Sequence, residues 1–454
     1  MGGICVKRSC LIAVCAVAML VVARAASAQA PVPGTMTSPA RAAAKNAAGK
    51  NAAGQTPGAS AQQPAPASHD RKESRHIGKM HNRIRKHAKH LKKAAPDDEY
   101  VRFTEKLKAD YGLTVLLSPT IMTQVGNPDG GPAATQVVLS PAIQWDVFKS
   151  RFGDGTVNFS YTSNRYYAAG QSAASLAGRL NLLSPVNDTP VSNRTFNQLT
   201  YSHDFPGEVL LIGVGQFPLL NFDANTYAGN QQLNFINYAL VQNASQTYPT
   251  ASLGAFAQVT PIRDTLDFVV GFQDANNISG NNIQTATAGD GPHTTFAYAQ
   301  WTPQVPGLGK GQYSLLYYHQ PAVPLQPAVS DGWAFNAAQP LNEKWGVFLR
   351  ANATTGPLSP IRNSVGGGFV FSDVLGRDHD NDQIGVGISR NAANMDFFAG
   401  QDVRTAEWLV EVYWNTVIWQ HFIIGPDVQV YINPALNPGQ SSVQVYTLRL
   451  TGLF

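Results

Sequence analysis

Apolar and polar side chains alternate one by one along many short stretches of this chain, from about residue 112 to its end. Around Trp408 the apolar positions carry even numbers up to Trp414, whereas Glu407 and Glu411 occupy odd positions. Successive side chains of a β-strand point to opposite faces, so this alternation predicts strands with one apolar and one polar face. Clusters of Gly, Asn, Asp and Pro separate these stretches and predict turns. The pattern therefore indicates an all-β protein.

The last such stretch runs from Val443 to Phe454 and alternates along its whole length. The polar face includes Thr447, Arg449 and Thr451. The opposite face is predicted to be apolar: Tyr446, Leu448, Leu450 and Phe454. A final strand that is apolar on one face, polar on the other and ends on an aromatic residue is typical of the closing strand of an outer-membrane β-barrel.

The absence of long apolar runs also favours a closed barrel over transmembrane helices. No stretch after the amino-terminal region holds 18 consecutive apolar residues, so no transmembrane helix is expected. A membrane-spanning sheet must close to pair its backbone groups. Residues 112–454, at about 20 residues per strand and connection, predict a transmembrane antiparallel barrel of about 16 strands, with 14 or 18 left open. Sixteen strands enclose an aqueous channel. Long connections are expected at 221–249, 276–293, 320–340 and 434–442.

The amino terminus has the pattern of a secretory signal peptide. Lys7 and Arg8 precede an apolar run over 11–22, and small residues form a cleavage site that ends at Ala28. Residues 1–28 are therefore excluded from the fold. All three cysteines lie in this segment. The mature chain is expected to have no disulfide, thiol nucleophile or cysteine metal site.

Two further segments precede the predicted barrel. Residues 29–68 are rich in Ala, Pro, Gly and Gln and predict a disordered linker. Residues 69–95 predict a basic helical segment, with ten Lys and Arg against two acidic residues over 69–93 and apolar positions spaced by three and four as in a short coiled coil. A solvated helix, an oligomerisation stalk and a clamp on peptidoglycan or lipid head groups all fit this segment. We expect it to lie in the periplasm.

The remaining charge and motif content argues against nucleic-acid binding and catalysis. Residues 94–454 hold 17 Lys and Arg against 27 Asp and Glu, so the overall charge of +4 hides an acidic body. The chain has neither a GxSxG nor an HExxH motif, and no enzyme activity or cofactor is predicted. The acidic run at 378–382 lacks the glycine and the final glutamate of a calcium loop, so a turn is expected there rather than a metal site.

Several motifs give the chain a resemblance to a known family. They are AEWLVEVYW at 406–414, GPDVQVYINP at 425–434 and NPG at 437–439, with further similar segments at 215–222, 232–240, 252–261 and 339–356. The chain resembles the carbohydrate-selective porins of the OprB type over most of residues 112–454. The resemblance implies an outer-membrane porin that admits sugars and has no cofactor.

Sugar passage through a pore needs polar groups on the inner wall, and charged pairs there narrow the channel. Charged side chains on the lipid face would cost about 2–4 kcal/mol each at mid-depth for arginine, so alternation should turn them inward. The predicted pore-lining residues are Glu407, Glu411, Asp427, Gln429, Tyr431, Arg350 and Arg449.

The leading hypothesis is passive diffusion of small neutral solutes, with sugars as the favoured class, across the outer membrane. Two alternatives stay open. One is a structural protein that is tethered to peptidoglycan through the basic segment at 69–93. The other is a general porin without sugar preference. Outer-membrane lipid is an expected partner in each case, and association into a homo-oligomer is left open.

Overall fold

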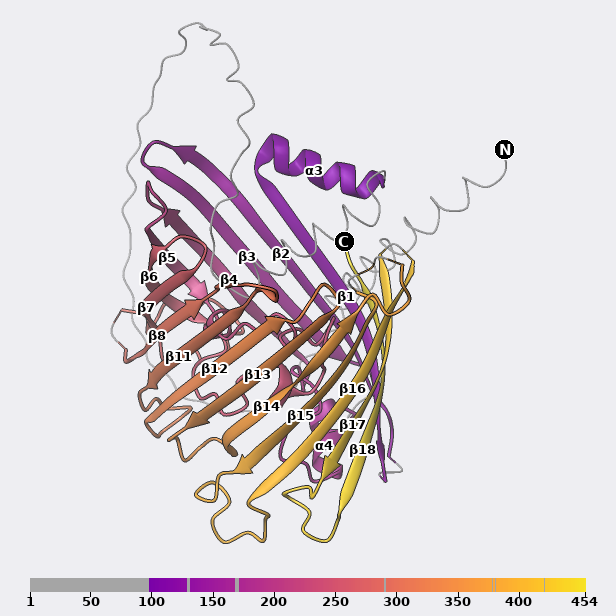
Figure 1. Cartoon of the computed structure of the whole chain (residues 1–454). Coiled ribbons are helices and arrows are strands. Elements are labelled where there is room, and N and C mark those ends of the chain that lie inside the picture. The colour runs from indigo at the N-terminus through magenta and orange to yellow at the C-terminus, as the bar shows by residue number, and fades with distance from the viewer. Residues whose placement is uncertain are drawn as a thin grey trace, which may run out of the picture. The chain divides into compact units, whose positions relative to one another are not determined.

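The computed structural model describes residues 98–454 except 129–130, 168–170, 290, 378, 380 and 420. Sixteen strands form one closed antiparallel barrel (Figure 1), in the order β1-β18-β17-β16-β15-β14-β13-β12-β11-β8-β7-β6-β5-β4-β3-β2. The predicted barrel and its strand number are confirmed. The predicted segments 1–28, 29–68 and 69–95 lie outside the described residues.

Each strand pairs with its neighbours in the chain, and β1 pairs with β18 to close the sheet. The strands of the barrel are β1 (Leu113–Asn127), β2 (Ala134–Ser150), β3 (Gly153–Tyr166), β4 (Asn193–Asp204), β5 (Leu210–Phe217), β6 (Ser252–Ile262), β7 (Leu266–Asp274), β8 (His293–Trp301), β11 (Gln312–Gln320), β12 (Ser330–Pro340), β13 (Trp345–Thr354), β14 (Ile361–Ser372), β15 (Gln383–Ala393), β16 (Ala406–Trp419), β17 (Phe422–Ile432) and β18 (Ser442–Gly452). A two-stranded ribbon, β9 (Gln304–Val305) with β10 (Gly309–Lys310), lies between β8 and β11.

The two ends of the barrel differ in their connections. At one end, which we call the turn end, the strands are joined mostly by short turns, such as the two residues between β2 and β3. The loop end carries the longer connections. Three of the four long connections were predicted well, but 320–340 was not, because β12 occupies 330–340. There Trp333 and Phe335 alternate with inward Ala334 and Asn336, a strand pattern that the flanking Gly and Pro residues obscured.

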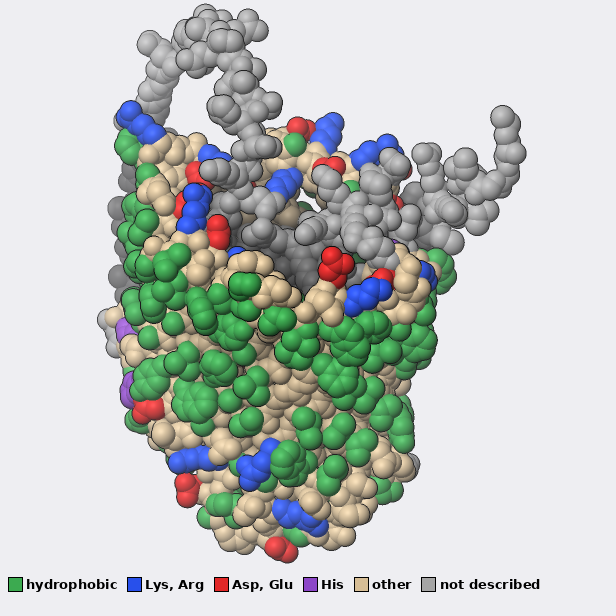
Figure 2. Space-filling view, in the orientation of Figure 1, with side chains coloured by type: hydrophobic (Ala, Val, Ile, Leu, Met, Phe, Trp, Pro, Cys, Tyr) green, Lys and Arg blue, Asp and Glu red, His purple; other side chains and the backbone are tan. Residues whose placement is uncertain are grey.

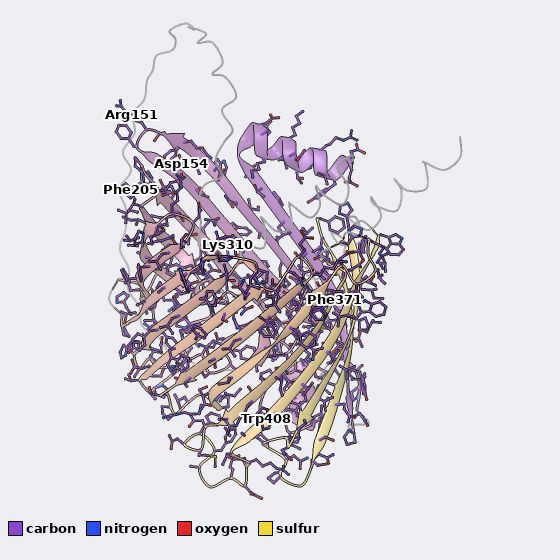
Figure 3. All side chains as sticks on the ribbon, in the orientation of Figure 1. Arg151, Asp154, Phe205, Lys310, Phe371 and Trp408 are labelled. Atoms are coloured by element: carbon purple, nitrogen blue, oxygen red, sulfur yellow. The ribbon has the colours of Figure 1, made fainter. Side chains whose placement is uncertain are left out.

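Alternation across the wall follows the sequence pattern. On β16, Trp408 is 42% exposed on the outer face, whereas Glu407 and Glu411 are fully buried on the inner face. Hydrophobic side chains cover the middle of the visible outer surface, and charged side chains gather at its two ends (Figure 2). Trp408 and Phe371 lie toward opposite ends of this wall (Figure 3). The outer surface therefore presents the apolar belt that a lipid bilayer requires.

Phe454 continues the outer face of β18, as its parity predicts. Strand β18 ends at Gly452, but Phe454 still pairs with Leu117 in the register of the β1–β18 ladder, and a Cβ on Gly452 would lie 2.8 Å from its ring. Phe454 is buried, exchanges backbone hydrogen bonds with Leu117, and stacks on the ring of His421 at a centroid distance of 5.3 Å. Tyr100 packs edge-on against the same phenylalanine.

The helix α3 (Glu99–Tyr111) precedes the barrel and lies at its turn end. The carboxylate of Asp98 caps the helix by accepting a 2.8 Å hydrogen bond from the backbone N–H of Tyr100. Gly112 ends it with a φ of 70°, a conformation that costs glycine little. The Gly112 carbonyl then accepts a 3.0 Å hydrogen bond from the N–H of Asp146 on β2, so the helix leads directly into the barrel wall.

Candidate functional site

Two of the long connections fold into the interior of the barrel rather than away from it. The β3–β4 segment (residues 171–192) contains α4 (Ala173–Arg179), and the β5–β6 segment (residues 218–251) contains η1 (Leu219–Phe222) and α5 (Tyr238–Val241). Apolar side chains of both segments pack in one cluster with inward residues of the wall. The cluster includes Leu176, Leu182, Val186, Phe235, Leu240, Phe348, Val370, Leu409, Tyr413, Tyr431, Val443 and Val445. This half of the interior is therefore packed.

Glu407 holds the β3–β4 segment. Its carboxylate accepts hydrogen bonds from the backbone N–H groups of Leu183 at 3.0 Å and Ser184 at 3.1 Å, and from that of Ala435 at 3.2 Å. Buried N–H groups outside regular structure need such acceptors. The carboxylate therefore replaces the backbone partners that this irregular segment lacks.

Glu411 lies two inward positions further along β16 and holds the β5–β6 segment in the same way. It accepts hydrogen bonds from the backbone N–H groups of Ile236 and Asn237, the second at 3.0 Å. The Asn237 side-chain amide donates to the Tyr431 hydroxyl at 2.6 Å and to Gln429 Oε1 at 3.1 Å. Three predicted site residues on β16 and β17 thus converge on one asparagine.

Arg449 and Arg350 fix the same segment at two further points. Arg449 donates to the carbonyl of Asn234 at 2.9 Å and to that of Gln231. Arg350 forms a buried ion pair with Asp223 at 3.2 Å and also donates to the Asp223 carbonyl at 2.7 Å. Each guanidinium therefore donates to carbonyl or carboxylate oxygens at places where the segment has no regular secondary structure to satisfy them.

Asp427 differs from the other predicted residues. It is inward and buried on β17, directly across from Thr447 of β18. Neither of its carboxylate oxygens has a hydrogen-bond partner in the described part of the chain. Its place on the inner face is the one that alternation predicts, but it holds neither inserted segment.

Glycines on the inner face of the wall make room for the β5–β6 segment. A side chain at Gly387 would place its Cβ 2.8 Å from Leu240 Cδ1 and 2.9 Å from Phe235 Cε1. A Cβ at Gly346 would lie 2.2 Å from the ring of Tyr227. The close approach of segment and wall therefore depends on the absence of these side chains.

Two tyrosines of the β5–β6 segment add neutral hydroxyl groups to this packed interior. Burial raises the pKa of Tyr238 and Tyr248 above the ordinary tyrosine value, so both phenols stay protonated. The Tyr238 hydroxyl accepts a 2.6 Å hydrogen bond from the side-chain amide of Gln246. The ring of Tyr248 packs edge-on against Tyr318 of β11 at 4.8 Å.

All seven predicted site residues lie on the inner face, but most of them contact the inserted segments. Sequence reasoning placed them by the two-residue period of their strands. It missed their partners at Leu183, Ser184, Asp223 and Ile236, because these lie in connections without periodicity. The one available signal was the composition of the β5–β6 connection, which holds buried Phe, Leu and Ile residues that an exposed loop would not carry.

Within the described residues, no group of three or more His, Cys, Asp or Glu side chains could hold a metal ion. None of the described helices has the length and apolar character needed to cross a membrane.

A closed 16-stranded barrel with an apolar belt and an interior narrowed by its own connections defines the class of the outer-membrane porins, which are channels. The family model for "Carbohydrate-selective porin, OprB family" matches residues 320–454. "Porin AaxA" of Chlamydia felis is 36% identical over 316 residues, covering 69% of this chain and 70% of the relative. "Porin AaxA" of Chlamydia muridarum is 38% identical over 315 residues, covering 69% and 67%.

The fold comparison agrees. The structure of Pseudomonas putida OprB at high pH superimposes with a TM-score of 0.62 over 77% of this chain and 96% of that chain, at 16% sequence identity. The chain belongs to the OprB family of porins.

Proposed function

We propose that this protein lets small neutral solutes, with carbohydrates as the preferred class, diffuse passively into the periplasm. The observation that carries the proposal is the fixed interior. Glu407, Glu411, Arg350 and Arg449 hold two inserted segments against one half of the wall through buried hydrogen bonds. These contacts narrow the lumen without any conformational change. A fixed constriction is what we expect of a channel that selects solutes by pore width and wall chemistry.

In this proposal the predicted site residues act on the solute mainly by setting the cross-section of the channel. Replacing Glu411 or Arg350 by alanine should change the single-channel conductance, since each substitution removes anchors of the β5–β6 segment. Unchanged single-channel behaviour in both variants would contradict this role.

The function itself is tested with purified protein in liposomes and planar bilayers. Swelling in neutral sugars of increasing size, with a sharp size limit, is the expected result. A general porin would conduct ions and pass sugars without preference for the sugars. Absence of both swelling and conductance would refute the channel and leave the structural alternative.

The structural alternative has one observation in its favour. Bacterial barrels place short turns in the periplasm and longer loops outside. Asp98 and α3 lie at the turn end, so the chain that precedes them starts from the side where peptidoglycan lies. We propose that the basic residues within 69–93 contact this anionic polymer. Retention of the full protein on isolated peptidoglycan, and loss of retention after deletion of residues 29–93, would support the contact.

A further inference from the structure

The inner face of β1–β4, which adjoins β18 of the packed half, carries many uncharged polar side chains. Ser118 on β1 is directly across from Ser140 on β2. The Ser140 and Thr162 hydroxyls lie 3.4 Å apart, and Thr162 on β3 is across from Thr195 on β4. Four hydroxyl groups therefore form one row across four neighbouring strands.

The next rows toward the turn end continue this pattern. Ser160 faces Gln198, and Asn158 lies between Gln144 on β2 and Thr200 on β4. The Gln198 amide donates to the Thr200 hydroxyl at 2.8 Å. We call this surface the hydroxyl–amide wall, and it consists of Ser140, Gln144, Asn158, Ser160, Thr162, Gln198 and Thr200.

No charged side chain occupies an inward position of the described β1–β4 residues at the level of these rows. The inward carboxylates of the same strands, Asp146, Asp154 and Asp204, lie closer to the turn end. The packed half differs in this respect, because its inward face carries Glu407, Glu411, Asp427, Arg350 and Arg449.

The solvent exposure of inward side chains indicates that open lumen lies beside the hydroxyl–amide wall. Ser140, Ser160 and Thr162 keep partial access to solvent, whereas the described inward residues of β15–β18 are buried throughout. The β3–β4 segment covers the wall only toward the loop end, where the Asn164 amide donates to the carbonyls of Thr189 and Val191. The β5–β6 segment reaches it through Asn221, which donates to Gln198 at 3.0 Å.

We propose that a small polyhydroxy solute crosses the barrel along the hydroxyl–amide wall and exchanges hydrogen bonds with Ser140, Ser160 and Thr162. This inference deepens the proposed function and rests on it. A hydroxyl group both donates and accepts, so it can pair with a sugar hydroxyl in either direction. An uncharged wall compensates a neutral solute for lost water contacts but offers an ion no opposite charge.

The test removes the three hydroxyls with little change in side-chain volume, in the variant S140A/S160A/T162V of the full-length protein. The sugar concentration that gives half-maximal flux of a neutral hexose should rise about fivefold, the effect of losing about one net hydrogen bond. Conductance in potassium chloride should stay the same. The matched control is T123V/T135V/S163A, which removes three hydroxyls from outward positions of β1, β2 and β3. It should leave both quantities unchanged.

Two results would overturn the inference. In the first, the triple variant keeps the half-saturating sugar concentration of the unmodified protein. In the second, ion conductance and sugar flux fall in equal proportion, which would mean that the wall acts only through channel width. A different result marks failure of the proposed function itself: unmodified protein that passes neither sugar nor ions refutes the channel and this inference together.

Discussion

The carboxylate of Glu411 on β16 accepts a 3.0 Å hydrogen bond from the backbone N–H of Asn237, a residue 174 positions earlier in the chain. Both groups are buried, and the same carboxylate also serves the N–H of Ile236. A carboxylate bond to two backbone donors is stronger than two neutral bonds. This contact therefore adds to the apolar packing that holds the β5–β6 segment in position.

Glu411→Gln should loosen that segment without unfolding the barrel. A glutamine offers one acceptor oxygen where the carboxylate offers two, and its N–H₂ group cannot accept from the second backbone N–H. We expect a cost of about 1–3 kcal/mol to the closed position of the segment. Hydrogen exchange at the Ile236 and Asn237 amides measures this cost, and open-channel current noise should rise in parallel.

The control for this substitution is Asp396→Asn, which neutralises an exposed carboxylate in the connection between β15 and β16. It should change neither exchange at residues 236 and 237 nor current noise. Equal protection of these amides in Glu411→Gln and the unmodified protein would show that packing alone positions the segment.

Gly387→Ala should displace the same segment by steric overlap. The added methyl group would lie 2.8 Å from Leu240 Cδ1 and 2.9 Å from Phe235 Cε1. Overpacking of this kind costs about 1–3 kcal/mol, and the midpoint of thermal unfolding should fall. Gly439→Ala is the control, because its new Cβ would meet only the Asn437 side chain at 3.7 Å.

A second substitution tests whether the overlap is the cause. Leu240→Ala removes one of the two side chains that the new methyl group would meet, so Gly387→Ala should cost less in the Leu240→Ala background than in the unmodified protein. The expected coupling between the two substitutions is about 0.5–3 kcal/mol. Strictly additive effects would show that the wall and Leu240 do not compete for the same space.

The strand-by-strand orientation of this barrel could be predicted because a β-strand repeats every two residues. Once Trp408 is assigned to the outer face, Glu407 and Glu411 must face inward, and the structure agrees. The same argument holds for the residues just beyond the last strand. Phe454 has the parity of an outward residue and pairs with Leu117 in the ladder register, while Tyr100 and His421 cover its ring, a burial that alternation does not indicate.

The partners of the inward residues could not be predicted in the same way. Leu183 and Ser184 lie more than 220 positions before Glu407, in a connection whose conformation is set by the wall that encloses it. Periodicity carries no information about such contacts. The glycines of the inner face show the same limit, since a close approach at Gly387 was foreseeable but its partners, Phe235 and Leu240, were not.

Leu448→Arg should destabilise the barrel through the lipid face. Leu448 is 54% exposed near the middle of β18, with its side chain on the outer surface. An arginine near the bilayer midplane costs about 2–4 kcal/mol. Urea unfolding in lipid vesicles measures this cost against Leu448→Ala, which shortens the side chain without adding a charge. Equal stability of the two variants would show that position 448 does not contact the hydrocarbon region.

Asp98→Ala should destabilise the first turn of α3 while the barrel stays folded. The substitution removes the cap that accepts hydrogen bonds from the N–H groups of Tyr100 and Val101, and it removes the contact with His421 at 3.4 Å. Loss of an N-cap costs about 1 kcal/mol, so hydrogen exchange at these two amides should become about fivefold faster. The β1–β18 pairing does not involve Asp98, and the thermal unfolding midpoint should not change.

Asp110→Ala is the matched control for this last substitution, because it removes an exposed carboxylate from the other end of the same helix. A negative charge near a helix C-terminus is unfavourable, so this change should leave exchange at Tyr100 and Val101 equal or slightly slower. Unchanged exchange in Asp98→Ala would show that Tyr100, packed against His421 and Phe454, holds the helix without its cap. Loss of the folded barrel in that variant would instead make α3 part of the closure between the first and last strands.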